Sequence, residues 1–392
     1  MPSGHGKERA RTNRAACERA RDRGRSLARL AMALCAPLVA LTACRSAPAE
    51  GPAAASAERT LSGVPRLEAQ ASGTSVLLQA VSAVDSSVVW ISGHGGTFVR
   101  TADGGRTWLA GRVPAADTLQ FRDVHALSER TAWLLAAGSA DMSRVYRTDD
   151  AGATWALQWT NPEEAGFYDC LDFWDARRGV VYGDAVEGEL RILYTDDGGG
   201  TWRQVPAERL PAALPGEGGF AASGTCVETR PGGLGWIAAG NAARARVFLT
   251  TDYGRSWSAA DAPVVAGEAA GLTSISMADD RCGTAFGGSL GVGDRRTDNV
   301  ARTVDGGRTW QPLPHVSFDG AVYGGLHVPG AGRGALLVVG PGGLAASDDG
   351  GNSWATVDVR TWWGIGSAGP DATWIAGPQG RIARLRWSST VD

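Results

Sequence analysis

The sequence has little of several features that mark common classes of protein. Its 392 residues include only six cysteines and five histidines. No C-x-x-C pair and no metal-spaced pair of histidines occurs, so structural zinc and thioredoxin-like chemistry have no support. No P-loop is present, and no G-x-G-x-x-G follows a strand and opens a helix, so no dinucleotide site is indicated. The 38 basic residues do not exceed the 41 acidic ones, which argues against nucleic acid as a partner. We expect neither a cofactor nor a metal.

What the sequence does contain is one short pattern in six near-copies, of which residues 302–310 are an example. Its core is [ST]-x-D-x-G-x-[ST]-W, and successive copies are 44 to 55 residues apart. The aspartates of the copies are Asp103, Asp150, Asp197, Asp252, Asp305 and Asp349. A repeat of this period is typical of a propeller or a solenoid. Asp accepts hydrogen bonds within its own turn and Gly adopts positive φ, so the pattern predicts a tight turn. A single active site would not need six copies, and we interpret these carboxylates as structural.

Runs of apolar and β-branched residues recur in step with this pattern. They lie at residues 88–93, 132–138, 179–183, 235–240, 283–288, 335–340 and 373–377. With a strand upstream of each run and the repeated motif as the turn before an outer strand, each unit has four strands. The sequence therefore predicts an all-β fold, a seven-bladed β-propeller with six copies of the motif. The last unit has no room for its own outer strand. We expect the N-terminal segment 65–70 to supply that strand and close the ring, which removes an exposed edge.

The motif resembles the Asp-box of the bacterial neuraminidase repeat. Over roughly residues 75–387, the chain resembles the photosystem II stability/assembly factor-like propellers, which are built of such repeats. The resemblance implies a non-enzymatic protein that binds a protein or peptide and supports the assembly or stability of a larger complex. Asp-boxes also occur in sialidases and other glycosidases, so the alternative is a glycan-binding or glycoside-hydrolysing propeller. Sialidases carry an F-R-I-P stretch near the start, whereas residues 121–124 read F-R-D-V and lack the proline.

The first 63 residues do not read as part of the fold. Residues 1–44 are interpreted as a lipoprotein signal peptide, because a basic segment precedes an apolar run too short to span a bilayer. That run ends in L-T-A-C, so Cys44 would carry the lipid. An ordinary secretory signal cut near Ala47 is the alternative. Residues 45–63, rich in Ala, Pro, Ser and Glu, predict a flexible tether, and 64–392 the propeller. We expect an exported protein whose only membrane contact is a lipid anchor in the cell envelope.

Two of the remaining cysteines, Cys170 and Cys226, fall at matching points of neighbouring repeats. An exported protein can form disulfides. However, equivalent positions on adjacent blades point in the same rotational sense rather than at each other. We therefore favour buried free thiols over a disulfide between these two residues.

The candidate ligand-binding face is the one opposite the motif turns, where long loops join neighbouring strands. Long loops within a compact repeat are often functional, and the longest spans residues 208–220. The third and fourth blades are the richest in charged and aromatic side chains. We expect a binding site formed by Arg122, Tyr168, Asp169, Asp172, Asp184, Glu187, Glu217 and Arg244. Opposed carboxylates with a tyrosine and arginines can serve glycoside hydrolysis, but a hydrated polar channel lining is the interpretation we favour.

Overall fold

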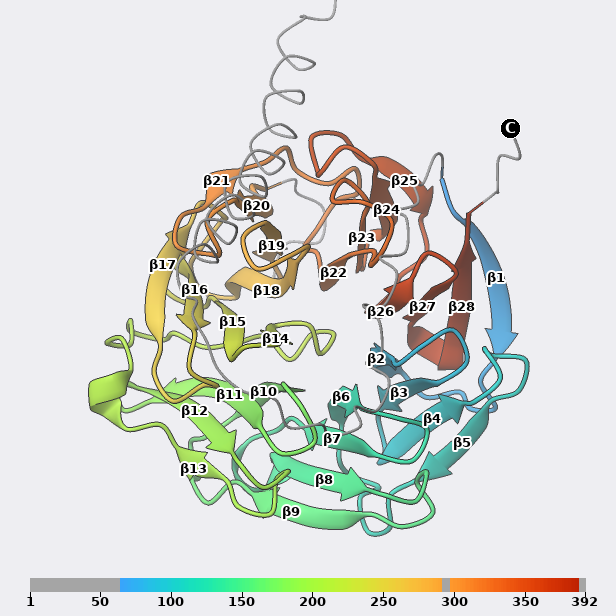
Figure 1. Ribbon diagram of the computed structural model, residues 1–392, viewed down its shortest axis with the longest axis horizontal. Coiled ribbons are helices and arrows are strands. Elements are labelled where there is room, and N and C mark those ends of the chain that lie inside the picture. Colours follow the sequence, from blue (N-terminus) through green and yellow to red (C-terminus); the bar gives the residue numbers. More distant parts are fainter. Residues whose placement is uncertain (1–63, 291–296, 388–392) are drawn as a thin grey trace, which may run out of the picture.

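The computed structural model describes residues 64–290 and 297–387. These residues form seven sheets of four antiparallel strands, arranged around a centre as the blades of a propeller (Figure 1). The predicted seven-bladed fold is therefore confirmed. The predicted signal peptide, with Cys44, and the predicted tether lie outside the described residues. In the part of the chain that is described, no helix is long and apolar enough to cross a membrane.

We number the blades in chain order, so that blade 1 contains β2–β5 and blade 7 contains β26, β27, β28 and β1. The innermost strands are β2 (Leu78–Ala83), β6 (Phe121–Ala126), β10 (Tyr168–Phe173), β14 (Val227–Arg230), β18 (Ala270–Met277), β22 (Gly324–His327) and β26 (Gly364–Gly369). The second strands are β3 (Val89–Gly93), β7 (Ala132–Ala136), β11 (Gly179–Val186), β15 (Leu234–Ala239), β19 (Gly283–Ser289), β23 (Leu336–Gly340) and β27 (Ala372–Ala376).

The third strands are β4 (Thr97–Thr101), β8 (Arg144–Thr148), β12 (Glu189–Thr195), β16 (Ala245–Thr250), β20 (Val300–Thr303), β24 (Gly343–Ser347) and β28 (Arg381–Arg386). The outer strands are β5 (Leu109–Arg112), β9 (Ala156–Thr160), β13 (Arg203–Gln204), β17 (Ser258–Ala262), β21 (Gln311–Pro312), β25 (Ala355–Asp358) and β1 (Arg66–Ala71). Three short 3-10 helices complete the elements: η1 (Ala140–Met142), η2 (Ala207–Arg209) and η3 (Pro378–Gly380).

Burial explains why the second strands read as unbroken apolar runs. Every residue of β3, β7 and β23 is buried, whereas β5 and β1 are mostly exposed. The second strand of a blade is covered on both faces by its neighbours, so its sequence has no polar alternation. The largest buried side chains include tryptophans on these strands, such as Trp133 and Trp374. Packing between blades, rather than within a blade, thus forms the core.

The inner strands face the centre of the ring and have no partner strand on that edge. In blades 2 to 6, a side chain of the preceding blade accepts a backbone N–H of the inner strand instead. The bonds are Ser82 Oγ with Ala126 N at 3.0 Å, Asp123 Oδ2 with Leu171 N at 2.7 Å, Asp172 Oδ2 with Thr229 N at 2.7 Å, Glu228 Oε2 with Met277 N at 2.8 Å, and Ser276 Oγ with His327 N at 3.1 Å. Buried backbone groups are costly when unpaired. These five bonds therefore account for several of the polar residues that the inner strands carry.

Strand β1 is the fourth strand of blade 7. It pairs antiparallel with β28 from Arg66 opposite Arg386 to Ala71 opposite Arg381. Residues from the two ends of the described chain thus lie in one sheet (Figure 1).

The six repeated motifs lie between the third and outer strands of blades 1 to 6, and we call them the motif turns. In each one the aspartate Oδ1 accepts hydrogen bonds from the Ser or Thr hydroxyl two residues before it and from the backbone N–H four residues after it. The same hydroxyl accepts the N–H of the conserved glycine of the core. The aspartates thus fix the turn conformation through local bonds.

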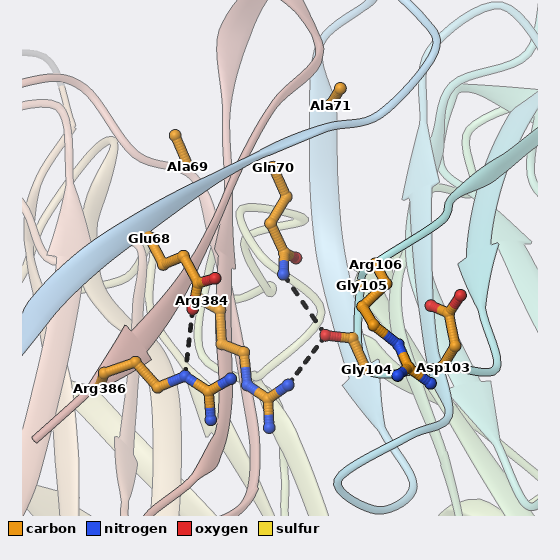
Figure 2. A pocket seen from close by; sticks show the side chains of 10 residues that line it. All are labelled: Glu68, Ala69, Gln70, Ala71, Asp103, Gly104, Gly105, Arg106, Arg384 and Arg386. Carbon is orange, nitrogen blue, oxygen red and sulfur yellow. Dashed lines mark hydrogen bonds and ion pairs between the residues drawn. The ribbon is translucent and has the colours of Figure 1, made fainter.

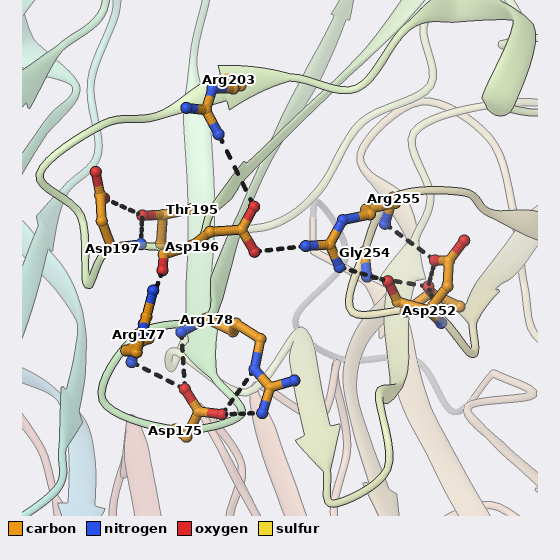
Figure 3. A network of polar contacts seen from close by, with 11 residues as sticks. Asp175, Arg177, Arg178, Thr195, Asp196, Asp197, Arg203, Asp252, Gly254 and Arg255 are labelled. Carbon is orange, nitrogen blue, oxygen red and sulfur yellow. Dashed lines mark hydrogen bonds and ion pairs between the residues drawn. The ribbon is translucent and has the colours of Figure 1, made fainter.

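The residue after each motif aspartate has a positive φ, which favours glycine. Four turns have glycine there, but Ala151 (φ 66°) and Tyr253 (φ 61°) occupy it in the other two. Tyr253 is held in place because the Arg178 guanidinium lies 3.7 Å from its ring centroid. Neighbouring turns are also linked by charge: Asp196 pairs with Arg255 of the next motif turn at 2.6 Å (Figure 3).

The expectation of free thiols at Cys170 and Cys226 is wrong, because the structure joins them in a disulfide with their Cα atoms 6.0 Å apart. The two cysteines do lie at matching points of blades 3 and 4: Cys170 is opposite Tyr182 of β11, and the Cys226 carbonyl accepts the N–H of Ala238 of β15. Inner strands of adjacent blades converge at the centre, so these side chains meet.

Candidate functional site

The feature that shapes the candidate site is a segment that enters the central channel. We call residues 217–226 the plug; it is the end of the long loop between β13 and β14, which reaches into the middle of the ring (Figure 1). Residues of blades 1 and 6 contact it across the channel from blade 4. Gln79 of blade 1 donates to the carbonyls of Ala221 (2.8 Å) and Ala222 (3.2 Å). In blade 6, the carbonyl of Tyr323 accepts a hydrogen bond from the Ser223 hydroxyl at 2.7 Å.

Small residues allow the plug to lie this close to its surroundings. A Cβ atom on Gly224 would lie 2.2 Å from an oxygen of Asp123, and one on Gly219 would lie 2.7 Å from Asp169. The disulfide from Cys226 to β10 ties down the end of the plug. The channel is thus occupied on the face away from the motif turns, which we call the loop face. A ligand on that face would meet a floor rather than an open pore.

A chain of polar contacts surrounds the plug, beginning at blade 1. The Oε1 atom of Gln79 lies 2.8 Å from His94 Nε2. Because the Gln79 amide nitrogen donates to the plug, its oxygen accepts here, and His94 Nε2 carries the hydrogen. Burial and the nearby Arg122 lower the pKa of His94. His94 is therefore neutral at pH 7.

The next member is Arg122, which is half-buried at the start of β6. Its Nε and Nη2 atoms donate to Gln120 Oε1 at 3.1 and 2.6 Å. Burial lowers the pKa of Arg122, while the nearby Asp169 raises it. An arginine bonded to a neutral amide keeps its charge and its remaining N–H groups for another acceptor.

Two acidic side chains, Asp169 and Asp184, meet beneath the plug. Burial raises the pKa of Asp169 well above its usual value, and the Asp184 carboxylate raises it further. Burial also raises the pKa of Asp184, to about 6. Two carboxyl groups in contact cannot both ionise readily, so they share a proton. The protonated Asp169 donates to Asp184, which also accepts the N–H of Gly219 at 3.0 Å.

Glu217, at the start of the plug, is fully buried and forms a bidentate pair with Arg246 of β16. Its Oε2 atom also accepts the N–H of Leu214 at 2.9 Å. A buried ion pair of this geometry fixes the loop where it turns into the channel. The sequence predicted Glu217 and Arg244 in the same site. Arg244 pairs instead with Asp261 at 2.8 Å on the exterior, and the partner of Glu217 is Arg246.

The loop face also has an aromatic pair that sequence reasoning missed. Tyr323 and Trp363 directly precede the inner strands of blades 6 and 7, and their ring centroids lie 5.0 Å apart. Both are partly exposed. The Tyr323 carbonyl accepts from the plug, and Gly364, next to Trp363, packs on the backbone of Gln79. One signal could have found them, because both residues stand directly before a glycine that opens an inner strand.

Some residues expected at this site lie elsewhere. Tyr168 is buried against Trp159, and burial raises its pKa. Asp172 is at the opposite end of β10 from the loop face, where it lies 2.5 Å from His125 Nδ1. Glu187 is exposed in the hairpin between β11 and β12. The expected convergence is therefore limited to Arg122, Asp169 and Asp184, with Glu217 beside them.

The arrangement favours binding over acid–base chemistry. A glycosidase needs its two carboxyl groups about 5–9.5 Å apart, with the sugar between them. Here Asp169 and Asp184 are bonded to each other, and Glu217 is bonded to Arg246. Among residues 64–290 and 297–387, no group of three or more His, Cys, Asp or Glu side chains is placed to hold a metal ion. What the loop face offers is a charged arginine and an aromatic pair around a rigid floor.

Comparison of the sequence with protein-family models and with curated proteins gives no match. Several solved structures are similar. YCF48 bound to D1 peptide has a TM-score of 0.59 and 18% identity, covering 85% of this chain and 100% of that chain. YCF48 from Cyanidioschyzon merolae has a TM-score of 0.57 and 16% identity, covering 82% and 98%. A GH74 xyloglucanase from Xanthomonas campestris has a TM-score of 0.52 and 13% identity, covering 79% and 59%. At these identities the likeness shows the propeller fold.

Proposed function

We propose that this chain is a peptide-binding propeller that holds a segment of a partner protein on its loop face and thereby supports the assembly or stability of an envelope complex. The observation that carries the proposal is the floor built by the plug. It leaves Arg122 and the Tyr323–Trp363 pair partly exposed around one centre. Aromatic and arginine side chains in such settings dominate the binding energy of protein interfaces. A structural neighbour, YCF48, was solved with a peptide bound.

The proposal includes the location of the protein. The L-T-A-C sequence ending at Cys44 supports lipidation and attachment to the cell envelope. The six motif turns are proposed to be Asp-boxes with a structural role, which their local hydrogen bonds support.

Crosslinking followed by affinity measurement tests the proposal. Replacing Tyr323 with p-benzoylphenylalanine puts a photoreactive group on the loop face, and mass spectrometry of the crosslinked product from an envelope extract gives the partner segment. That segment is then synthesised, and its affinity is measured for the wild type, Arg122→Ala, Trp363→Ala and the matched control Arg281→Ala on the other face. We expect each loop-face variant to bind about tenfold or more weakly, with the control unchanged. Equal affinity for all four proteins would refute the proposal.

The glycoside-cleaving alternative has its own test. Sialosides and a broad set of aryl glycosides are incubated with the wild type and with Asp184→Asn. We expect no sugar release from either protein. Turnover by the wild type that Asp184→Asn abolishes would replace the binding proposal with a hydrolase.

A further inference from the structure

A second candidate site lies far from the plug, at the seam between blades 7 and 1. A pocket of about 500 Å³ there is lined by β1, the end of β28 and the first motif turn. Figure 2 shows Arg384 and Arg386 extending from β28 on one side and Arg106 from the motif turn on the other. Three guanidinium groups around one pocket stand out in a chain with an excess of acidic residues.

The base of this pocket is a set of three side chains that we call the seam clamp: Trp374, Arg384 and Gln70. Trp374 and Arg384 are cross-strand neighbours, and the Arg384 guanidinium lies 4.6 Å from the Trp374 ring centroid. Trp374 Nε1 donates to Gln70 Oε1 at 3.1 Å. Arg384 and Gln70 both donate to the carbonyl of Gly104 in the motif turn, at 2.8 and 3.4 Å. Blade 7 thereby holds the motif turn of blade 1.

The same set recurs between blades 2 and 3, where we call Trp133, Arg147 and Gln158 the internal clamp. Trp133 and Arg147 are cross-strand neighbours, with the guanidinium 5.0 Å from the ring centroid. Trp133 Nε1 donates to Gln158 Oε1 at 3.1 Å. Arg147 and Gln158 donate to the carbonyl of Gly198, the equivalent of Gly104, at 3.0 and 3.2 Å. The molecule therefore contains a matched reference for the seam clamp.

The two clamps differ in the charge beside the arginine. Two residues after Arg147 stands Asp149, whose carboxylate accepts from Nη2 at 2.8 Å and Nε at 3.2 Å. Two residues after Arg384 stands Arg386. The hydrogen bonds of Arg384 go only to the carbonyls of Gly104 and Asp371.

Arg384 is only 8% exposed. Burial and the like charge of Arg386 lower its pKa, whereas the charges of Glu68 and Asp371 raise it. Its guanidinium donates to backbone carbonyls and not to a carboxylate, and a buried cation is costly without an anion bonded directly to it. The seam clamp thus has a second positive charge in the place where the internal clamp has a carboxylate.

The carboxylates that line the pocket are not hydrogen-bonded to the Arg384 guanidinium. Both oxygens of Asp103 are engaged by Thr101 and Thr107 within the motif turn. Glu68 pairs with Arg386 Nε at 3.1 Å, and both side chains are partly exposed. No described residue forms an ion pair with Arg106, which is exposed. Arg106 and the exposed part of the Arg386 guanidinium that Glu68 does not bind therefore remain available to an incoming anion, with Arg384 behind them.

We propose that this pocket binds the carboxylate groups of an acidic peptide segment, as a second site independent of the loop face. The carboxylate is the group that the internal clamp uses in the same place. The pocket is also lined by Ala69 and Ala71 of β1, the outermost strand of its sheet. An outer strand offers its free backbone edge to an extended peptide, and small side chains leave that edge accessible.

The test measures binding of a labelled, acetylated and amidated penta-glutamate peptide to the full chain by fluorescence anisotropy at low salt. Penta-glutamine is the neutral control probe. Arg386→Asp recreates the carboxylate of the internal clamp, Arg106→Ala removes one exposed charge, and Arg281→Asp in blade 5 is the charge-matched control. We expect binding of penta-glutamate alone, about fivefold weaker binding by Arg106→Ala, no detectable binding by Arg386→Asp, and no change for Arg281→Asp.

Two further readings complete the test. We expect Arg386→Asp to melt no lower than the wild type, so that lost binding reports the site and not the fold. We also expect inorganic phosphate to displace the peptide only through general screening, as chloride of equal ionic strength does. Wild-type affinity in Arg386→Asp and Arg106→Ala, equal binding of penta-glutamine, or specific displacement by phosphate would overturn the proposal.

Discussion

The seam clamp and the internal clamp perform the same mechanical task under different constraints. Each holds the motif turn of the following blade through a tryptophan, an arginine and a glutamine. The internal clamp lies where the chain runs on continuously, and its arginine is neutralised by an aspartate of its own motif. Blade 7 has no motif, so Arg386 stands where that aspartate would be. The seam clamp thus retains the packing of the repeat but not the carboxylate beside the arginine.

Blade 5 shows that the set is not required everywhere. It has Thr284 opposite Arg302, and its Gln311 lies directly opposite Arg302 instead of two residues further along, where Gln70 and Gln158 lie. The tryptophan is therefore not required for the fold of a blade. In the two clamps it covers the arginine and ties the outer strand to the second strand.

Replacing the tryptophan of each clamp should have the largest effect on stability. Trp133→Ala and Trp374→Ala each delete a fully buried side chain, and each should cost about 3–5 kcal/mol in the free energy of unfolding. Trp374→Ala should also raise hydrogen exchange in β1, and Trp133→Ala in β9, because each of these outer strands is held by a single neighbouring strand. Denaturant unfolding and exchange mass spectrometry measure the two effects. A loss below about 1 kcal/mol in either variant would contradict the role given to the clamps.

Replacing the glutamines should have the next largest effect. Gln70 accepts from both Trp108 and Trp374, whereas Trp133 has a second acceptor in Gly198 besides Gln158. Gln70→Leu leaves indole N–H groups unpaired and should cost about 1–3 kcal/mol, with Gln158→Leu at the lower end of that range. Urea denaturation of both variants measures this order. The reverse order would show that the seam clamp is the weaker of the two.

Exchanging the charges should produce smaller and opposite effects. Arg386→Asp gives the seam clamp a carboxylate and should stabilise the fold by about 0.5–1 kcal/mol, while Asp149→Arg should destabilise it by a similar amount. Both effects should shrink as salt is added, because the groups are partly exposed. Melting temperatures at two ionic strengths check this prediction. Shifts of the same sign in both variants would show that charge is not the difference between the clamps.

The smallest effect concerns the aspartates of the two clamped turns. Hydrogen bonds from Thr107 hold the pKa of Asp103 well below its usual range, and the Thr201 N–H lowers that of Asp197. An acid with a lowered folded-state pKa adds stability above its unfolded pKa of about 4, and that stability is lost as the pH falls below 4. Asp103→Asn and Asp197→Asn should therefore narrow the difference in melting temperature between pH 6 and pH 3. An unchanged difference in both variants would refute the linkage.

Much of the fold follows from local patterns in the sequence. The predicted run at 283–288 corresponds to β19 at Gly283–Ser289, and the run at 132–138 to β7 at Ala132–Ala136. Such runs are readable because both faces of a second strand are buried. The motif turns are readable because their hydrogen bonds lie within eight residues.

The candidate site was less predictable because its contacts are long-range. The plug has no apolar periodicity, and its entry into the channel depends on partners such as Gln79 and Asp123, which are about a hundred residues or more away in sequence. The disulfide was missed because the prediction did not allow for how closely the inner strands of adjacent blades approach at the centre of the ring, where the two Cα atoms are 6.0 Å apart. Loop length was the one local signal, and it correctly marked the stretch before the plug.

Hydrogen exchange of the chain with and without the crosslinked partner peptide tests peptide binding on the loop face most directly. Protection is predicted in the segments that surround the floor, at 118–122, 217–224, 320–324 and 360–364, with the motif turns of blades 2 to 5 unchanged. Protection confined to the motif turns or the outer strands, with no change in the plug, would contradict binding on the loop face.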